Sequence, residues 1–331
     1  MPNPACRVCG NVMGNRVHVV REMMYGTKED FSYYECATCS SLQILEVPED
    51  LSKYYPNDYL GSRPPQSATA VQPHIPKGIR LFLRQQRVRY ILYGKNLLGW
   101  LVTKVGRDYF GYHWSWFRIA GVEPNSRILD AGCGPGWLLR SLQAQGFTNL
   151  TGQDLFQKWR VEGLTILQCP LSEVDGAFDL IMLHHSFEHM PDPLAALKDI
   201  KRLCAPRGVV LIRLPVAGCP AWKEYGVDWY QIDAPRHLVI PSRKGMEILA
   251  ERVGLHLFRV DFDSDERQFC CSEQYRQGIP LKDPRSYFAS HRSSTEPDLS
   301  SPSQISAFKA KAREANINGE GDQGCFYFRK G

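Results

Sequence analysis

The sequence has no apolar stretch long enough to cross a bilayer. Its longest apolar runs, residues 79–83 and 97–102, are too short or too interrupted. The first six residues also lack the charged and then apolar pattern of a secretory signal. We therefore expect a cytoplasmic protein. A strong excess of charge is absent too, since 40 Lys and Arg face 35 Asp and Glu for a net charge of +5. No nucleic acid partner is expected from so mild a charge.

The 11 cysteines do not indicate a disulfide framework, because their number is odd and the chain is long. Four of them form two pairs, Cys6-x-x-Cys9 and Cys36-x-x-Cys39, and 26 residues separate the pairs. Two such pairs predict a four-thiolate zinc site, with an inserted hairpin taking up the long spacer. A redox pair is the alternative, but no thioredoxin-like unit accompanies these pairs. Four thiolates leave the metal no open position, so a structural role is expected.

Composition divides the chain into three parts. Residues 1–45 are expected to be a β-rich zinc ribbon, residues 46–107 a Pro/Tyr-rich linker followed by a basic helical segment, and residues 108–331 the main domain. The segment 77–107 holds eight Lys or Arg and no Asp or Glu, and its glycines predict two helices or one broken helix. A solvated helix face is our first interpretation of that charge. Peripheral contact with a membrane surface is the second, and nucleic acid binding is the third.

Strands and helices alternate from Arg127 onward. Expected strands cover residues 127–129, 150–153, 165–168, 178–183, 209–214, 255–262 and 325–328, and expected helices cover 136–145, 192–204 and 242–253. The segment Pro206-Arg207-Gly208 is expected to form a turn. Repeated β–α units predict an α/β fold with an open, mostly parallel sheet. Residues 264–322 separate the last two strands and are expected to form an insertion.

The most informative motif is the glycine-rich stretch from Asp130 to Gly136, which follows a strand and precedes a helix. Ligands bind beyond the carboxyl ends of strands at such turns. A carboxylate at Asp130 would repel a phosphate 4 Å away by about 4 kcal/mol at an effective dielectric near 20. A cationic ligand without phosphate, such as S-adenosylmethionine, fits better. Asp154, at the end of the next strand, can accept hydrogen bonds from ribose hydroxyls.

These motifs resemble those of class I S-adenosylmethionine-dependent methyltransferases. The resemblance covers residues 127–263 and 323–330 and rests on the segments 129–136, 152–154, 178–193, 203–208 and 233–238. It implies a Rossmann-like sheet of seven strands whose last strand is antiparallel. It also implies that a set of residues binds the cofactor: Asp130, Gly132, Gly134, Gly136, Asp154, Leu171 and His184.

The order of a zinc ribbon and then this domain resembles bacterial sugar and glycan methyltransferases. That resemblance implies methylation of a hydroxyl, or of a carbon, on a sugar or glycan precursor. Two alternatives remain, which are O-methylation of a small aromatic or quinone-type acceptor, and a non-catalytic cofactor-binding module with a zinc-ribbon interaction domain. The sequence does not specify the oligomeric state.

An alcohol acceptor needs a base that works near neutral pH, and histidine suits that task. His185 follows the fourth strand and His237 lies after the fifth, so we predict that these two residues act as the base or contact the acceptor. Glu188 and His189 are expected to orient the loop, with a metal-binding pair as the weaker interpretation. Asp233 is expected to orient His237 or to bind a hydroxyl.

Overall fold

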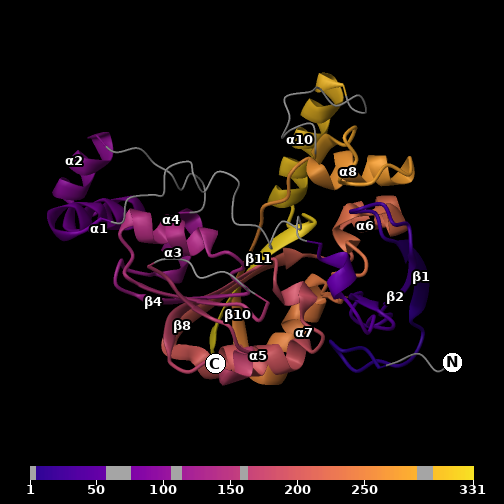
Figure 1. The fold of residues 1–331 in the computed structure, drawn as a ribbon, viewed down its shortest axis with the longest axis horizontal. Helices are drawn as coiled ribbons and strands as arrows, with labels where there is room; N and C mark the ends of the chain where they lie inside the picture. The colour runs from indigo at the N-terminus through magenta and orange to yellow at the C-terminus, as the bar shows by residue number, and fades with distance from the viewer. Residues whose placement is uncertain (1–4, 57–75, 106–113, 157–162, 289–300) are drawn as a thin grey trace. The chain divides into compact units, whose positions relative to one another are not determined.

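The computed structural model describes residues 5–56, 76–105, 114–156, 163–288 and 301–331 (Figure 1). Parts of the predicted linker and of the predicted insertion therefore lie outside the described residues. The described chain forms two compact units. Unit 1 comprises Met1–Tyr54, Phe187–Leu197 and Arg213–Phe326, and unit 2 comprises Tyr55–Ser186, Lys198–Ile212 and Tyr327–Gly331.

A sheet of seven strands has the order β10-β11-β8-β7-β4-β5-β6. Its pairs β4–β5, β4–β7 and β5–β6 are parallel, and the last strand of the chain is antiparallel, so the predicted α/β fold is confirmed. The strands are β4 (Arg127–Ala131), β5 (Asn149–Gln153), β6 (Thr165–Leu167), β7 (Phe178–His184), β8 (Cys204–Pro215), β10 (Leu255–Phe262) and β11 (Gln323–Lys330). The strand β7 is apolar and almost wholly buried, as expected for a central parallel strand.

A second, smaller sheet has the order β1-β2-β3-β9 and is antiparallel. Its strands are β1 (Arg16–Arg21), β2 (Asp30–Glu35), β3 (Leu42–Ile44) and β9 (Val239–Ile240). The first three strands agree with the β-rich composition expected of residues 1–45. The pairing of Leu42 with Ile240 adds a strand from almost two hundred residues further along the chain.

Helix ends follow their capping residues. The helix α4 (Trp137–Gln145) ends at Gly146, and α7 (Arg243–Val253) begins at the N-cap Ser242 and ends at Gly254. The Asp192 carboxylate accepts a hydrogen bond from the Ala195 amide at the start of α5 (Pro193–Leu203), the helix expected over residues 192–204. The described residues also form α3 (Trp114–Ala120), α6 (Pro220–Tyr225), α8 (Arg267–Arg276) and α10 (Pro302–Ile317), with short 3-10 turns at 52–54, 171–173, 187–189, 226–228 and 230–232.

The basic segment forms two helices, α1 (Gly78–Tyr93) and α2 (Leu97–Val105), which pack on each other (Figure 1). The helix α1 stops at Gly94, whose φ of 69° is left-handed, so the predicted break is confirmed. A Cβ on Gly99 would lie 2.2 Å from the Gln86 carbonyl oxygen, so glycine allows α2 to approach α1 closely. No helix among the described residues combines the length and the hydropathy needed to span a membrane.

One predicted turn is wrong. Residues 206–208 lie inside β8 rather than before it. A Cβ on Gly208 would lie 2.7 Å from the Phe178 carbonyl oxygen. Glycine at this position therefore permits close approach to the neighbouring strand, and the chain does not turn there.

Candidate functional site

The first cluster of predicted residues lies in unit 2, at the carboxyl end of β4. Gly132, Gly134 and Gly136 all have positive φ angles, between 50° and 74°. The amides of Gly132 and Cys133 both donate hydrogen bonds to the Gln153 carbonyl oxygen, at 2.7 and 3.0 Å. These bonds fix the turn against the end of β5. The structure thus brings the three predicted glycines together in one turn before α4, in a conformation that glycine adopts easily.

Asp154 holds this turn from the neighbouring strand. One oxygen of its carboxylate accepts a hydrogen bond from the Gly134 amide at 2.9 Å, and the other accepts one from the Phe156 amide at 2.9 Å. The carboxylate is therefore held in a fixed orientation. Each oxygen retains a second lone pair, so both ribose hydroxyls of a nucleoside could donate to it.

Asp130 is a buried carboxylate without a cation near it among the described residues. Its side chain is 4% exposed. Burial, and secondarily the charge of Asp154, raise the pKa of Asp130 to about 7. Two carboxylates beside one glycine turn favour a ligand that carries positive charge and oppose one that carries phosphate. The ammonium and sulfonium groups of S-adenosylmethionine fit this requirement.

The end of β7 lies next to the same turn. Asp130 pairs with Met182 in the parallel register, and the Ser186 hydroxyl donates a hydrogen bond to the Ala131 carbonyl oxygen at 2.8 Å. A Cβ on Gly132 would lie 2.3 Å from the Ser186 Cβ, so glycine is required for this contact. Ser186 therefore anchors the loop, and His185, directly before it, lies beside the glycine turn with a left-handed φ of 52°. A histidine in this conformation is uncommon and often marks a functional position.

The remaining predicted cofactor residues, His184 and Leu171, also lie in unit 2. His184 ends β7, and its ring contacts that of Trp116 with 4.5 Å between the ring centroids. Leu171 begins a 3-10 turn after β6. The Gln153 side chain donates to the Cys169 carbonyl oxygen at 2.7 Å and holds the segment before this turn at the end of β5.

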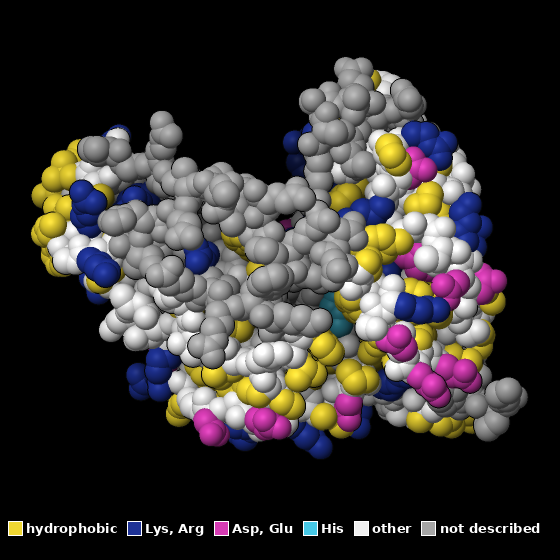
Figure 2. Space-filling view, viewed as in Figure 1, with side chains coloured by type: hydrophobic (Ala, Val, Ile, Leu, Met, Phe, Trp, Pro, Cys, Tyr) yellow, Lys and Arg dark blue, Asp and Glu magenta, His cyan; other side chains and the backbone are white. Residues whose placement is uncertain are grey.

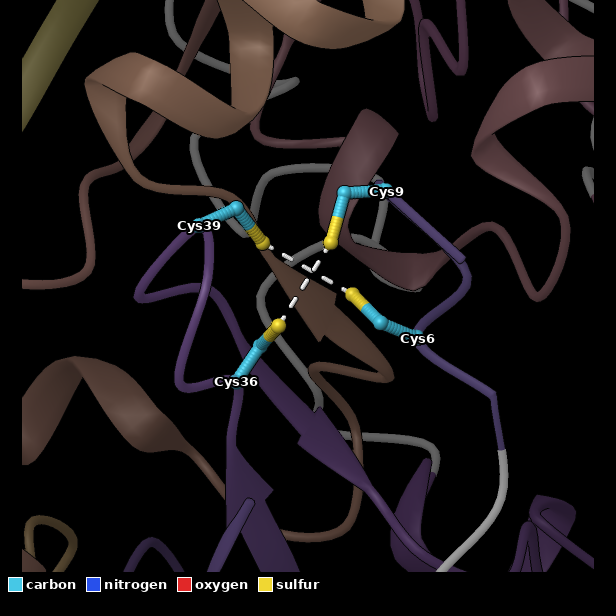
Figure 3. Close-up of side chains that lie close together, drawn as sticks. All are labelled: Cys6, Cys9, Cys36 and Cys39. Atoms are coloured by element: carbon cyan, nitrogen blue, oxygen red, sulfur yellow. Dashed lines mark hydrogen bonds between the residues drawn. The ribbon is translucent and has the colours of Figure 1, made fainter. Parts of the chain in front are cut away.

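The four paired cysteines converge in unit 1 (Figure 3). The Sγ atoms of Cys6 and Cys39 are 3.6 Å apart, and those of Cys9 and Cys36 are 3.5 Å apart. Sulfur atoms around a tetrahedral zinc ion would be separated by about 3.8 Å, given Zn–S bonds of about 2.3 Å. The four thiols therefore have the spacing that zinc needs.

Each cysteine pair lies in the same kind of turn. The Gly10 amide donates to the Cys6 carbonyl oxygen, and the Ser40 amide donates to the Cys36 carbonyl oxygen, both at 2.8 Å. The Gln43 side-chain amide also donates to the Cys6 sulfur at 2.9 Å. Such N–H···S bonds stabilise the negative charge of metal-bound thiolates. Both cysteine pairs are thus held in tight turns.

A third cluster, also in unit 1, contains Glu188, His189 and His237. One ligand atom from each of the three side chains lies within 4.8 Å of the other two. Glu188 is fully buried and His237 is nearly so. Burial, and secondarily the neighbouring His189, lower the pKa of His237 to about 4, so its imidazole is neutral at pH 7.

The remaining acid predicted near His237 has a different partner. Both oxygens of Asp233 accept hydrogen bonds from Arg236, at 2.6 to 3.0 Å, while the nearest distance from Asp233 to the His237 ring is 3.9 Å. The same guanidinium pairs with the buried Glu22 at 2.8 Å. Asp233 therefore orients Arg236 more directly than it orients His237.

Sequence reasoning missed Ser186 and Trp116. A serine and a tryptophan have no fixed spacing relative to a glycine-rich turn, and only the folded chain shows that they contact Ala131 and His184. The position of Ser186 in the loop between His185 and Glu188, both of which were predicted site residues, is the sequence feature that could have indicated its role.

Part of the chain is similar to known methyltransferases. Residues 116–260 match the family model of a methyltransferase domain. The matched residues make up a little under half of the chain. The chain is 27% identical over 113 residues to the 2-methyl-6-phytyl-1,4-hydroquinone methyltransferase of Synechocystis sp., covering 29% of this chain and 34% of that protein. It is 30% identical over 133 residues to the malonyl-acyl-carrier-protein O-methyltransferase of Serratia marcescens, covering 37% and 51%.

A solved S-adenosylmethionine-dependent methyltransferase from Mesorhizobium loti aligns with a TM-score of 0.40 and 17% identity, covering 66% of this chain and 97% of that one. The chain spans between a third and about half of the length of the two curated relatives.

Proposed function

We propose that this protein transfers the methyl group of S-adenosylmethionine to an acceptor. The observation that carries the proposal is the buried Asp130 beside Asp154 at a turn of three glycines in the left-handed conformation. This site has fixed acceptors for ribose hydroxyls and an anionic environment suited to a cation. When bound, S-adenosylmethionine would supply an electrophilic methyl carbon on a sulfonium.

The residues of the chain would orient the cofactor and remove a proton from the acceptor. Asp154 would hold the ribose and Asp130 would favour the positive end of the cofactor. His185 is our candidate base, since it is only partly buried and its neighbour Ser186 anchors it beside the glycine turn. Its replacement by Gln should lower turnover about 100-fold or more while cofactor affinity stays the same. Loss of cofactor affinity in that variant would assign His185 to binding instead.

Calorimetric titration with S-adenosylmethionine tests the cofactor assignment. Asp154→Ala should weaken binding at least tenfold, because two hydroxyl bonds to a charged acceptor are lost. Asp175→Ala is the matched control, since Asp175 is an exposed acid of the same unit. Equal affinities for the two variants, or no binding to the folded wild-type protein, would contradict the proposed site.

For the acceptor, we propose a hydroxyl, or a carbon, of a sugar or glycan precursor. The support is the combination of a cysteine cluster suited to structural zinc with a methyltransferase domain in one chain. We propose that Cys6, Cys9, Cys36 and Cys39 hold that zinc, with no open position for chemistry.

A hydroquinone or other aromatic hydroxyl is the second candidate acceptor, and the hydroquinone methyltransferase among the relatives favours it. Transfer of a labelled methyl group would be measured with nucleotide-linked sugars and with hydroquinones. Turnover on sugars alone supports the first candidate, and turnover on hydroquinones alone supports the second. Cofactor binding without turnover on either class would favour a non-catalytic role.

A further inference from the structure

The cluster of Glu188, His189 and His237 is held by the backbone on both sides. Glu188 and His189 lie in the 3-10 turn at residues 187–189, while His237 lies just before β9. The Leu238 amide donates to the Glu188 carbonyl oxygen at 2.8 Å and joins the two segments. The imidazole rings lie with their centroids 4.8 Å apart.

Backbone carbonyls determine the tautomer of both histidines. The Nδ1 atom of His189 lies 2.9 Å from the Arg236 carbonyl oxygen, and the Nδ1 atom of His237 lies 2.7 Å from the Gln231 carbonyl oxygen. A carbonyl oxygen only accepts hydrogen bonds, so Nδ1 carries the proton in each neutral ring. The Nε2 atom of each ring then carries the lone pair. Histidines that bind metals are oriented in this way, by donation from the other ring nitrogen.

We propose that Glu188, His189 and His237 bind a divalent transition-metal ion, distinct from the metal of the cysteine cluster. Two imidazole nitrogens and one carboxylate oxygen form a donor set that suits zinc, manganese, iron or cobalt. The three ligand atoms lie within 4.8 Å of one another, so modest movements would place all three around one ion. Asp233 is not a ligand in this proposal, because Arg236 engages both of its oxygens.

Three protein ligands leave coordination positions for water or for an oxygen of an acceptor. The cysteine cluster has no such position. The two sites therefore differ in chemistry, and a metal bound at the second site could be exchanged while the four-thiolate zinc stays in place.

Metal binding to the full chain tests this proposal without any assay of methyl transfer. Wild-type protein that carries zinc in the cysteine cluster would be dialysed against Co²⁺, and bound metal would be counted. We expect one equivalent of Co²⁺ with weak visible absorption and without the strong sulfur charge-transfer bands of a thiolate site. His189→Ala and Glu188→Gln should each lose that equivalent, while His256→Ala, at an exposed position, should retain it.

Absence of the Co²⁺ equivalent from the wild-type protein would overturn the proposal, and so would its retention in both His189→Ala and Glu188→Gln. Should either variant fail to fold, the wild-type count and spectrum still decide. If the methyltransferase proposal were wrong, the cofactor titration would show no binding, while the count of bound Co²⁺ would stay the same.

A second observation, in unit 2, concerns the outer face of α1 and α2. Six large apolar side chains are exposed there, with Leu97 at 76% and Ile79 at 68%. The remaining four are Phe82, Leu98, Trp100 and Leu101. Exposed lysines and one arginine lie among them, namely Lys77, Arg80, Lys95 and Lys104. Figure 2 shows these two kinds of side chain gathered over α1 and α2, at the left of the view. We refer to these ten residues as the basic apolar face.

The helices α1 and α2 are well packed on the side that faces the rest of the unit. The exposed apolar side chains are therefore not the result of an unfolded segment. Gly99 of α2 lies against Gln86 of α1, and the buried Arg87 donates to Gln145 of α4 at 2.8 Å. The acid Glu123 lies elsewhere in the unit and pairs with Arg89. Residues 77–107 contain no Asp or Glu. The exposed face is therefore apolar and cationic with no opposing charge on its own helices.

We propose that the basic apolar face binds the surface of an anionic phospholipid membrane. Lysine and arginine attract anionic headgroups, while Trp100, Phe82 and the leucines can enter the boundary between headgroups and acyl chains. Four of the six apolar side chains are aliphatic and cannot stack on bases, whereas RNA is bound through phosphate contacts and stacking. Charge complementarity together with exposed apolar area thus favours a membrane.

Sedimentation with vesicles tests this proposal on the full chain. We expect binding to vesicles of phosphatidylglycerol and phosphatidylcholine, and little binding to phosphatidylcholine alone. Leu97→Asp should lower the partition coefficient at least tenfold, and Lys95→Ala about fivefold. Ile317→Asp, an equally exposed apolar position in α10, is the matched control and should bind as the wild type does.

Equal binding of Leu97→Asp and Ile317→Asp would overturn the proposal. So would binding to an RNA oligonucleotide without binding to anionic vesicles. Both variants replace exposed side chains, so the fold should be retained, and circular dichroism would check it.

Discussion

Replacing Asp130 by asparagine should stabilise the folded chain and weaken cofactor binding at the same time. Burial and the nearby Asp154 raise the pKa of Asp130 from 3.8 to about 7 in the folded chain. The folded state therefore holds this proton more tightly than the unfolded state does. The resulting stabilisation is fully present below pH 3.8 and is lost as the pH rises to about 7. Above that pH, the folded chain carries a buried charge that has no cation beside it in the described residues.

The size of the effect follows from the pKa values. A difference of one pH unit in pKa corresponds to about 1.4 kcal/mol, so ionising Asp130 in the folded chain costs about 4 kcal/mol at pH 8. Asparagine keeps the shape of the side chain and never ionises. The free energy of unfolding of D130N should therefore exceed that of the wild type by up to about 4 kcal/mol at pH 8. The difference should be small at pH 4.5.

Cofactor binding should change in the opposite direction. A charge-assisted interaction contributes about 1.5 to 3 kcal/mol, so D130N should bind S-adenosylmethionine roughly 10- to 100-fold more weakly at pH 8. This pairing of greater stability with lost binding is typical of functional sites that hold strained or uncompensated groups.

Urea unfolding at pH 4.5, 6 and 8, together with calorimetric titration at pH 8, measures both effects. Asp175→Asn is the control, because Asp175 is exposed and should show neither effect. The reasoning is refuted if D130N is less stable than the wild type at pH 8, or if it binds the cofactor equally well.

Three further predictions concern stability. Gly132→Ala and Gly121→Ala both place a side chain at a φ above 70°, but only at Gly132 would the new Cβ overlap a neighbouring side chain. In urea unfolding, Gly121→Ala should lower the free energy of unfolding by about 1 kcal/mol, and Gly132→Ala should lower it several times more. Cys36→Ser should remove zinc and expose the N-terminal residues to protease, whereas Cys169→Ser should keep both the metal and the protection. Glu22→Gln breaks a fully buried ion pair with its arginine partner and should lower the free energy of unfolding by about 3 kcal/mol, and a loss below 1 kcal/mol would show that the pair is dispensable.

Local patterns predicted the strand, glycine turn and helix around Asp130 well. The strand, turn and helix around Asp130 depend on residues within ten positions of one another, and the three glycines adopt the left-handed angles that only glycine adopts easily. Capping residues likewise fixed the ends of α5 and α7. In such segments the chain near each residue determines its conformation, so a single sequence contains the necessary information.

Contacts between distant segments were beyond the reach of those patterns. The prediction of a turn at Gly208 was wrong because the glycine serves the neighbouring strand β7, and nothing within β8 reveals that neighbour. The pairing of β3 with β9 joins residues 42–43 to 239–240, and β9 is only two residues long. A strand so short has no periodicity to recognise, and its place depends on the partner.

The two predicted catalytic histidines show what burial adds to a sequence pattern. Both follow a strand of the main sheet, and the motifs gave them equal weight. In the folded chain His185 is only partly buried, whereas His237 is enclosed and its pKa falls to about 4. A base works best when its pKa is close to the working pH. The low pKa of His237 therefore makes it a poor proton acceptor at neutral pH. The same low pKa leaves the Nε2 lone pair available at neutral pH. That environment makes His237 better suited to binding a cation or an acceptor hydrogen than to removing a proton, and it favours His185 as our candidate for the base.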